Sequence, residues 1–282
     1  MKPEAIIVPL DGTEEALAAL PVARPLADAF GATLHVVYVG ERALPSRTIL
    51  GELGLDAEDV KGFVVEQRTG PPAEEILRFA AGRQQPLLVL CTHTDTAKPR
   101  GTLGGVAEHV LVHAPCGVVL VEPERGRRPW SLRRILLPHD GTPTTAAAMD
   151  PAGDLAELTG AEVLVLYVAA PGAPPPVEPG TLTAPRYLDQ PQHEWPAWAA
   201  EFLGRMCALG HPPSEVRFRL LMAAGEPGEE IVRVARESES DLIVLAWHGV
   251  WEVEHALTMK EVIRRAPCPE LVVRAGLEGG QG

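Results

Sequence analysis

An internal repeat is the feature that most constrains how this chain can fold. An apolar run that ends in Pro-Leu-Asp-Gly-Thr at residues 9–13 recurs as Pro-His-Asp-Gly-Thr at residues 138–142, so that Asp140 lies 129 positions after Asp11. The same offset relates Tyr38 to Tyr167, in the apolar runs LHVVYV and VLVLYV. Two units with identical spacing are hard to produce by chance. The 282 residues are therefore predicted to form two similar halves.

The repeat continues at a larger offset and so reveals an insertion. GPPAEEIL from Gly70 matches GEPGEEIV from Gly225, 155 positions later, which places 26 extra residues between the second and third strands of the second half. We place this insertion at about residues 169–213. It contains a proline-rich stretch and then Trp198, Phe202 and Met206 at a spacing of four, which predicts an apolar helix face.

The apolar runs predict the fold class. They are short and unbroken, as expected for strands of a parallel sheet that is covered by helices on both faces, and they alternate with helical segments. Each half is thus predicted to be a doubly wound α/β domain, with its ligand crevice beyond the carboxyl ends of the strands. We expect domains at residues 1–124 and 133–275, an Arg-rich linker at 125–132 and a flexible tail at 276–282.

Charge and composition exclude several partners. The chain has 25 Lys and Arg against 38 Asp and Glu, a net charge of −13, which would repel nucleic acid and anionic lipid. No apolar run approaches the roughly 18 residues of a membrane helix, and the start of the chain lacks a signal-type apolar core. The four cysteines form no CxxC pair, which argues against a redox motif and against a zinc ribbon. We therefore expect a cytoplasmic protein that binds neither nucleic acid nor membrane.

Four segments recur in the same order in both halves. They are VPLDGTEEALAAL, LHVVYV, GPPAEEIL and GGVAEHVLVHAPCGVVLV in the first half, and LPHDGT, VLVLYV, GEPGEEIV and VIRRAPCPELVV in the second. In this order and spacing they resemble the universal stress protein family. The resemblance implies a Rossmann-like, five-stranded parallel sheet in each half, of the adenine nucleotide alpha hydrolase-like type. It also implies an intramolecular pseudo-dimer through the last strands, residues 117–121 and 270–274. It leaves open a homodimer of whole chains, and it names no protein partner.

The resemblance further implies an adenine nucleotide, ATP or AMP, in the first half. ATP-binding members hold the base near the first two strands and the phosphates on a Gly-x2-Gly-x9-Gly-Ser/Thr loop after the fourth, because glycines let backbone N–H groups approach phosphate. Here Cys91 and Thr94 stand where the first two glycines are expected, and Gly105 stands in place of the hydroxyl residue. The candidate binding residues are Pro9, Leu10, Asp11, Val36, Thr92, Thr94, Gly101, Gly104 and Gly105.

The corresponding loop of the second half departs further from the pattern. It is three residues shorter, and Ala256-Leu257 replaces the Gly-Ser pair. Trp247 adds bulk next to His248, which is the counterpart of His93; both histidines are expected to be exposed. We therefore expect the second half to bind no phosphate and to carry an apolar plug or a pocket for another ligand.

The sequence shows no motif that is typical of a catalytic site or of a metal site. The sequence contains no GxxxxGK[ST], GxSxG or GxGxxG motif. His109 and His113, four residues apart on a predicted helix, lack a third ligand in sequence. The leading hypothesis is a non-enzymatic stress-response protein that senses or sequesters adenine nucleotide. The alternatives are a ligand-free interaction or scaffold protein with degenerate phosphate loops in both halves, and a slow ATPase or adenylate-transferring enzyme.

Overall fold

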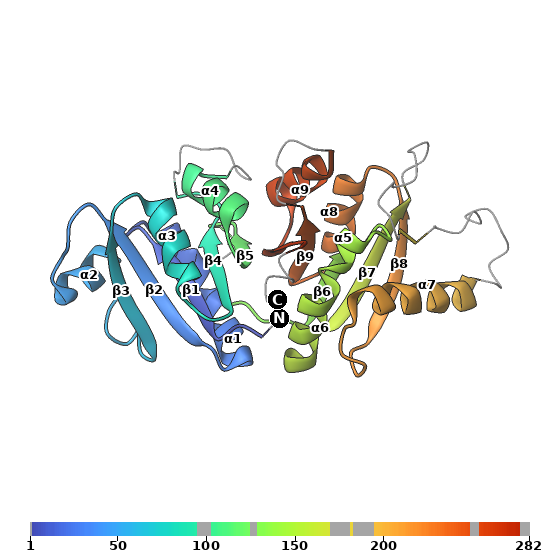
Figure 1. Cartoon of the computed structure of the whole chain (residues 1–282), viewed down its shortest axis with the longest axis horizontal. Helices are drawn as coiled ribbons and strands as arrows, with labels where there is room; N and C mark the ends of the chain where they lie inside the picture. The colour runs from blue at the N-terminus through green and yellow to red at the C-terminus, as the bar shows by residue number, and fades with distance from the viewer. Residues whose placement is uncertain are drawn as a thin grey trace.

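The computed structural model describes residues 2–94, 103–124, 129–169, 181–182, 195–248 and 254–276 (Figure 1). The candidate residue Gly101, residues 125–128 of the Arg-rich linker and the proline-rich stretch lie outside these ranges.

Ten strands form a single sheet in the order β3-β2-β1-β4-β5-β10-β9-β6-β7-β8. Each half contributes five strands in the same relative order, and all strand pairs within a half are parallel. The prediction of two five-stranded, doubly wound sheets is confirmed. The strands are β1 (Ala5–Leu10), β2 (Thr33–Gly40), β3 (Phe63–Thr69), β4 (Pro86–Cys91), β5 (Gly117–Val121), β6 (Arg134–Pro138), β7 (Glu162–Ala169), β8 (Phe218–Ala224), β9 (Leu242–Trp247) and β10 (Glu270–Arg274).

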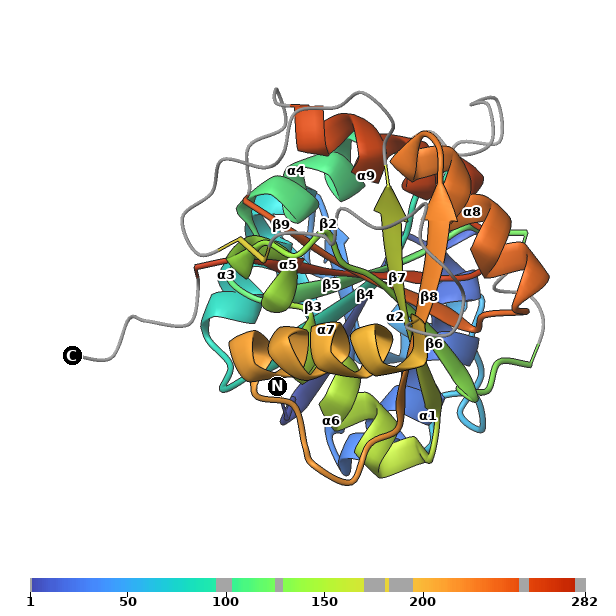
Figure 2. The same cartoon turned by 90° about the vertical axis from the view of Figure 1, so that its right-hand side faces the viewer.

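Helices cover both faces of this sheet. Figure 2 shows α4, α8 and α9 above it and α1, α6 and α7 below it. The first half contains η1 (Ala16–Ala19), α1 (Leu20–Phe30), α2 (Ser46–Glu52), α3 (Pro72–Ala81) and α4 (Gly105–His113). The second half contains α5 (Pro143–Ala146), α6 (Met149–Thr159), α7 (Trp195–Gly210), α8 (Pro227–Glu237) and α9 (Glu254–Arg265). Two apolar cores result, one on each face of the sheet.

The two halves join through their last strands, as predicted. β5 and β10 pair antiparallel at the centre of the sheet, with Leu271 opposite Val119, and both side chains are about 1% exposed. Figure 1 shows the two halves on either side of this junction. Because the junction is both hydrogen-bonded and apolar, it makes one continuous sheet of two similar units.

The inserted segment contains α7, the helix predicted from the four-residue spacing. Phe202 and Met206 are almost fully buried, and the Phe202 ring packs edge-on against Tyr167 of β7 at 5.5 Å between ring centres. A Cβ atom on Gly210 would lie 2.3 Å from the Met149 side chain, so α7 ends in close contact with α6. Among the helices of the described residues, none combines the length and apolar character needed to cross a bilayer.

The strand order determines where a ligand is expected. The chain runs from β1 outward to β2 and β3 and then returns to β4, which lies on the other side of β1. In doubly wound sheets the crevice opens at this reversal, outside the carboxyl ends of the strands. The equivalent place in the second half lies beyond β6 and β9.

Candidate functional site

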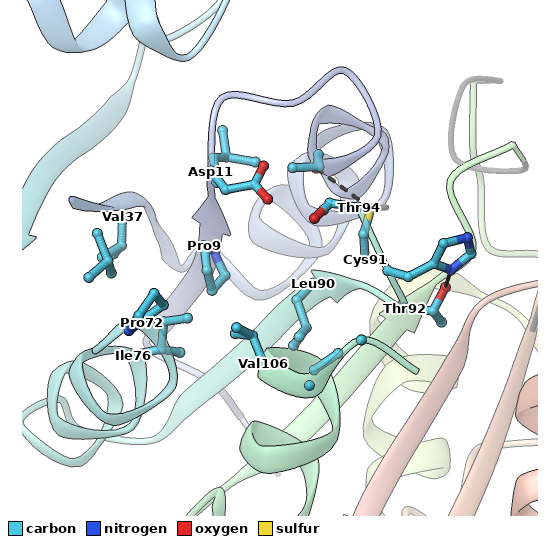
Figure 3. A pocket seen from close by; sticks show the side chains of 17 residues that line it. Pro9, Asp11, Val37, Pro72, Ile76, Leu90, Cys91, Thr92, Thr94 and Val106 are labelled. Atoms are coloured by element: carbon cyan, nitrogen blue, oxygen red, sulfur yellow. Dashed lines mark hydrogen bonds between the residues drawn. The ribbon is translucent and has the colours of Figure 1, made fainter. Parts of the chain in front are cut away.

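A cavity of about 280 Å³ lies at the reversal point of the first half (Figure 3). Side chains and backbone from the ends of β1, β2 and β4 and from the first turns of α3 and α4 surround it. The lining residues are Pro9, Leu10, Asp11, Ala16, Val37, Val39, Pro72, Ile76, Leu90, Cys91, Thr92, His93, Thr94, Gly104, Gly105, Val106 and Ala107.

The structure brings seven of the nine candidate residues together around this cavity. They are Pro9, Leu10, Asp11, Thr92, Thr94, Gly104 and Gly105. Val36 does not line it: the side chain is fully buried in the core on the opposite face of the sheet. Its neighbours Val37 and Val39 line the cavity instead, because successive side chains of a strand point to opposite faces. Gly101 lies outside the described residues.

The walls of the cavity are largely apolar. Val37 from β2, Ile76 from α3 and Leu90 from β4 face one another across it, and Val106 of α4 lies at the rim and is 41% exposed (Figure 3). Sequence reasoning found Gly105 at the start of α4 but missed Ile76 of α3 and Val106 of α4. The alternation of strands and helices was enough to find them, since the helix that follows each parallel strand begins at the same edge of the sheet.

Asp11 supplies a carboxylate at the opening. Its Oδ1 atom accepts hydrogen bonds from the Thr13 backbone N–H at 3.0 Å and from the Thr13 hydroxyl at 2.5 Å. Oδ2 makes no hydrogen bond within the described part of the chain, and the residue is exposed. The turn therefore holds Asp11 in place while one oxygen remains available to a ligand.

The start of α4 supplies backbone donors. Gly104 lies just before the helix, and its N–H donates to the Thr92 carbonyl oxygen at 2.7 Å. The N–H groups of Gly105, Val106 and Ala107, in the first turn of α4, have no acceptor within the helix, and together with the helix dipole they favour an anion. A Cβ atom on Gly105 would meet nothing within 4 Å, so the backbone there is open to a bound group.

His93 was expected to be exposed, and this was wrong. It is 8% exposed and lines the cavity, with its Nδ1 atom 3.1 Å from the hydroxyl of the fully buried Thr92. Packing at the end of β4 covers the ring, whereas the counterpart His248 is exposed.

Cys91 is inert as a nucleophile. Its thiol donates to the Glu15 carbonyl oxygen at 2.8 Å, and burial raises the pKa of Cys91 to about 12. Because the thiolate is the reactive form, Cys91 contributes volume and a hydrogen bond to the cavity rather than chemistry.

The second half contains a different set of residues at the equivalent place. Trp247, the counterpart of Thr92, is 4% exposed, and Ala256 and Leu257 replace the two glycines at the start of the last helix. The Leu182 backbone N–H, from the inserted region, donates to the Gly141 carbonyl oxygen at 2.8 Å. Apolar side chains thus take the place of the open backbone.

Asp140 differs from its counterpart Asp11 in being less exposed and in accepting one more hydrogen bond. Its Oδ1 atom accepts hydrogen bonds from the Thr142 backbone N–H, the Thr142 hydroxyl and the Thr145 hydroxyl, at 2.6–2.9 Å. Burial raises the pKa of Asp140, but these hydrogen bonds outweigh it and hold the pKa below its usual value. The carboxylate here stabilises the turn between β6 and α5.

His139 stands where the first half has Leu10. Its Nδ1 atom accepts a hydrogen bond from the Gly141 N–H at 2.9 Å, while the buried Nε2 atom finds no partner within the described residues. Burial lowers the pKa of His139 to about 4, although the charge of Asp140 opposes this. The ring is therefore neutral at pH 7.

Comparison with known proteins agrees with the architecture. The sequence profile of the universal stress protein family matches residues 49–122 and 131–274. A universal stress protein of Methanocaldococcus jannaschii is 31% identical over 137 residues, which are 42% of this chain and 81% of that protein. One of Thermus aquaticus is 34% identical over 134 residues, 42% of this chain and 98% of that protein. The crystal structure of a universal stress protein from Archaeoglobus fulgidus, 16% identical, superposes with a TM-score of 0.65 over 98% of this chain and all of that one.

Proposed function

This chain belongs to the universal stress protein family, and we propose that it is a non-enzymatic stress-response protein that binds one adenine nucleotide, ATP or AMP, in the cavity of its first half. The proposal rests mainly on three features that lie together where the strand order of the first half reverses. They are an apolar cavity, the Asp11 carboxylate with an available oxygen, and the start of α4.

The size of the cavity favours enclosure of the nucleoside only. Its volume of about 280 Å³ is near the lower end of the range of roughly 300–1,000 Å³ for small-molecule pockets. In our proposal the base lies between Val37, Ile76 and Leu90. Asp11 Oδ2 accepts hydrogen bonds from sugar hydroxyls, and the phosphates lie outside the apolar part, against the backbone of Gly104 and Gly105.

The chemistry of the lining supports binding rather than catalysis. Burial keeps the Cys91 thiol protonated, so it is no nucleophile. Asp11 is held by its hydrogen bond from the Thr13 N–H, which leaves the carboxylate placed to accept hydrogen bonds from a ligand. One observation favours the alternative, a ligand-free interaction protein: Cys91 fills a position where a glycine is expected from nucleotide-binding relatives. Isothermal titration calorimetry with ATP and AMP separates the two functions, since the interaction protein would bind no nucleotide.

Replacing Asp11 by Asn is expected to weaken nucleotide binding about tenfold. The substitution preserves the Oδ1 acceptor for Thr13 but replaces the second carboxylate oxygen with an amide donor, and charged acceptors form the stronger hydrogen bonds. Isothermal titration calorimetry with ATP and AMP measures the change. The matched control is Asp140→Asn, at the equivalent turn of the second half, which should leave the affinity unchanged. Equal affinities of wild type and Asp11→Asn would remove Asp11 from the site.

Replacing Gly104 by Val is expected to weaken nucleotide binding at least tenfold while the fold is preserved. Gly104 has extended backbone angles (φ −70°, ψ 153°) that suit a β-branched residue, and the nearest atom to an added Cβ, the Thr92 carbonyl oxygen, would lie at an ordinary 3.5 Å. The new methyl groups would keep phosphate away from the backbone. Calorimetry gives the affinity, and the melting temperature reports the fold. Undiminished affinity in a folded Gly104→Val protein would contradict this position for the phosphates.

A further inference from the structure

We propose that His109 and His113, on the exposed face of α4, together bind one divalent transition-metal ion of the copper or nickel class. Both residues are exposed, whereas Ala107, Val110 and Leu111 of the same helix are buried against the sheet. A spacing of four residues places two side chains on one face of a helix, one turn apart. The pair therefore projects into solvent from a helix that is held firmly by its opposite side.

One ring of the pair is already oriented for metal binding. The Nδ1 atom of His113 lies 2.9 Å from the His109 backbone carbonyl oxygen. A carbonyl oxygen only accepts, so this contact places the proton of the neutral ring on Nδ1 and leaves the lone pair on Nε2. Metal-binding histidines are commonly held by the same kind of hydrogen bond, which fixes both tautomer and ring direction.

The two rings lie close enough to share one ion. Their centres are 4.3 Å apart. With a metal–nitrogen bond of about 2.0 Å and about 1.1 Å more to the ring centre, two imidazoles on one ion have centres about 4.5 Å apart at a right angle and about 5 Å apart in a tetrahedron. Among the divalent ions that imidazole binds, affinity rises along the series to Ni²⁺ and Cu²⁺, so these are the expected occupants.

Binding requires the ring of His109 to turn. The two ring planes are now stacked, with 25° between them, and a nitrogen lone pair lies in the plane of its ring. His109 is exposed, so it turns about its Cβ–Cγ bond in solvent while the backbone contact holds His113. Within the described residues no group of three or more His, Cys, Asp or Glu side chains is arranged to hold a metal. Water therefore completes the coordination, and the net charge of −13 favours a cation.

The test is a titration of the tag-free full chain with Ni²⁺, followed by isothermal titration calorimetry. We expect one Ni²⁺ per chain at this site and at least a tenfold loss of affinity in His109→Ala and in His113→Ala. The control is His211→Asn, which removes another exposed histidine and keeps a residue that tolerates its positive φ of 56°; its Ni²⁺ affinity should equal that of the wild type. Because the two mutated side chains are exposed, the metal-free variants should melt at the wild-type temperature.

Two results would overturn the proposal. Equal Ni²⁺ affinity in the wild type and in both alanine variants would remove the histidine pair as the site, and so would a wild type that binds no Ni²⁺ at millimolar concentration. A parallel titration with Zn²⁺ tests the metal class. Zn²⁺ is expected to bind more weakly than Ni²⁺, and equal or tighter Zn²⁺ binding would contradict the assigned class of metal.

Discussion

Replacing Leu271 by Ala should lower the free energy of unfolding by about 3 kcal/mol, since truncating a fully buried leucine costs roughly 2–5 kcal/mol. Leu271 is 1% exposed and lies opposite Val119 where β10 pairs with β5. The substitution leaves a cavity where β5 and β10 pair, which is the place where the two halves join into one sheet. Urea denaturation of wild type and variant gives the difference.

The control for this experiment is Leu158→Ala. Leu158 is 43% exposed at the end of α6, and its truncation should change the free energy of unfolding by less than about 0.5 kcal/mol. If Leu271→Ala were no more destabilising than Leu158→Ala, the pairing of β5 with β10 would not contribute to the stability of the protein.

Replacing His139 by Leu should remove a large pH dependence of stability. The pKa of His139 is about 4 in the folded protein against 6.5 for an ordinary histidine. Between these values the unfolded chain binds a proton that the folded protein does not, so stability falls as the pH drops from 6.5 to 4. At about 1.4 kcal/mol per pKa unit, His139 lowers the free energy of unfolding by about 3 kcal/mol at pH 4 relative to pH 7.

Leucine is the matched substitution because Leu10 occupies the equivalent position of the first half. Urea denaturation at pH 7 and at pH 4 should show that wild type loses about 3 kcal/mol more than His139→Leu, since the other titrating groups are common to both proteins. His211→Asn, at an exposed histidine, should behave as the wild type. Parallel pH profiles for wild type and His139→Leu would mean that the ring is not buried in its neutral form.

The fold was predictable from the sequence because the repeat supplied two readings of each element. β5 and β10 have the residue bounds expected of the last strands, and α7 contains the predicted buried residues Phe202 and Met206. Apolar runs and helix periodicity depend on local sequence, so the strands and helices predicted from them agree with those of the structure.

The details of the candidate site depend on which face of the sheet a side chain points to and on how distant segments pack. The sequence determines both less closely than it determines strands and helices. Val36 and Val37 are equally apolar neighbours, and a shift of one residue along a strand exchanges the two faces of the sheet. His93 and His139 are 8% and 2% exposed, and no pattern in the sequence distinguishes these rings from the exposed ring of His248. Pattern alone placed Asp11, Thr92 and Gly104 correctly at the carboxyl edge, because strand ends and turns are local features.

Native mass spectrometry of the full chain with ATP and AMP tests nucleotide binding by the first half most directly, because it counts bound nucleotides per chain. We expect one nucleotide on the wild type, one on Asp140→Asn, and strongly reduced occupancy on Gly104→Val. A wild type that carries no nucleotide at millimolar ligand would contradict the proposed function, and so would a nucleotide that stays bound to Gly104→Val but is lost from Asp140→Asn.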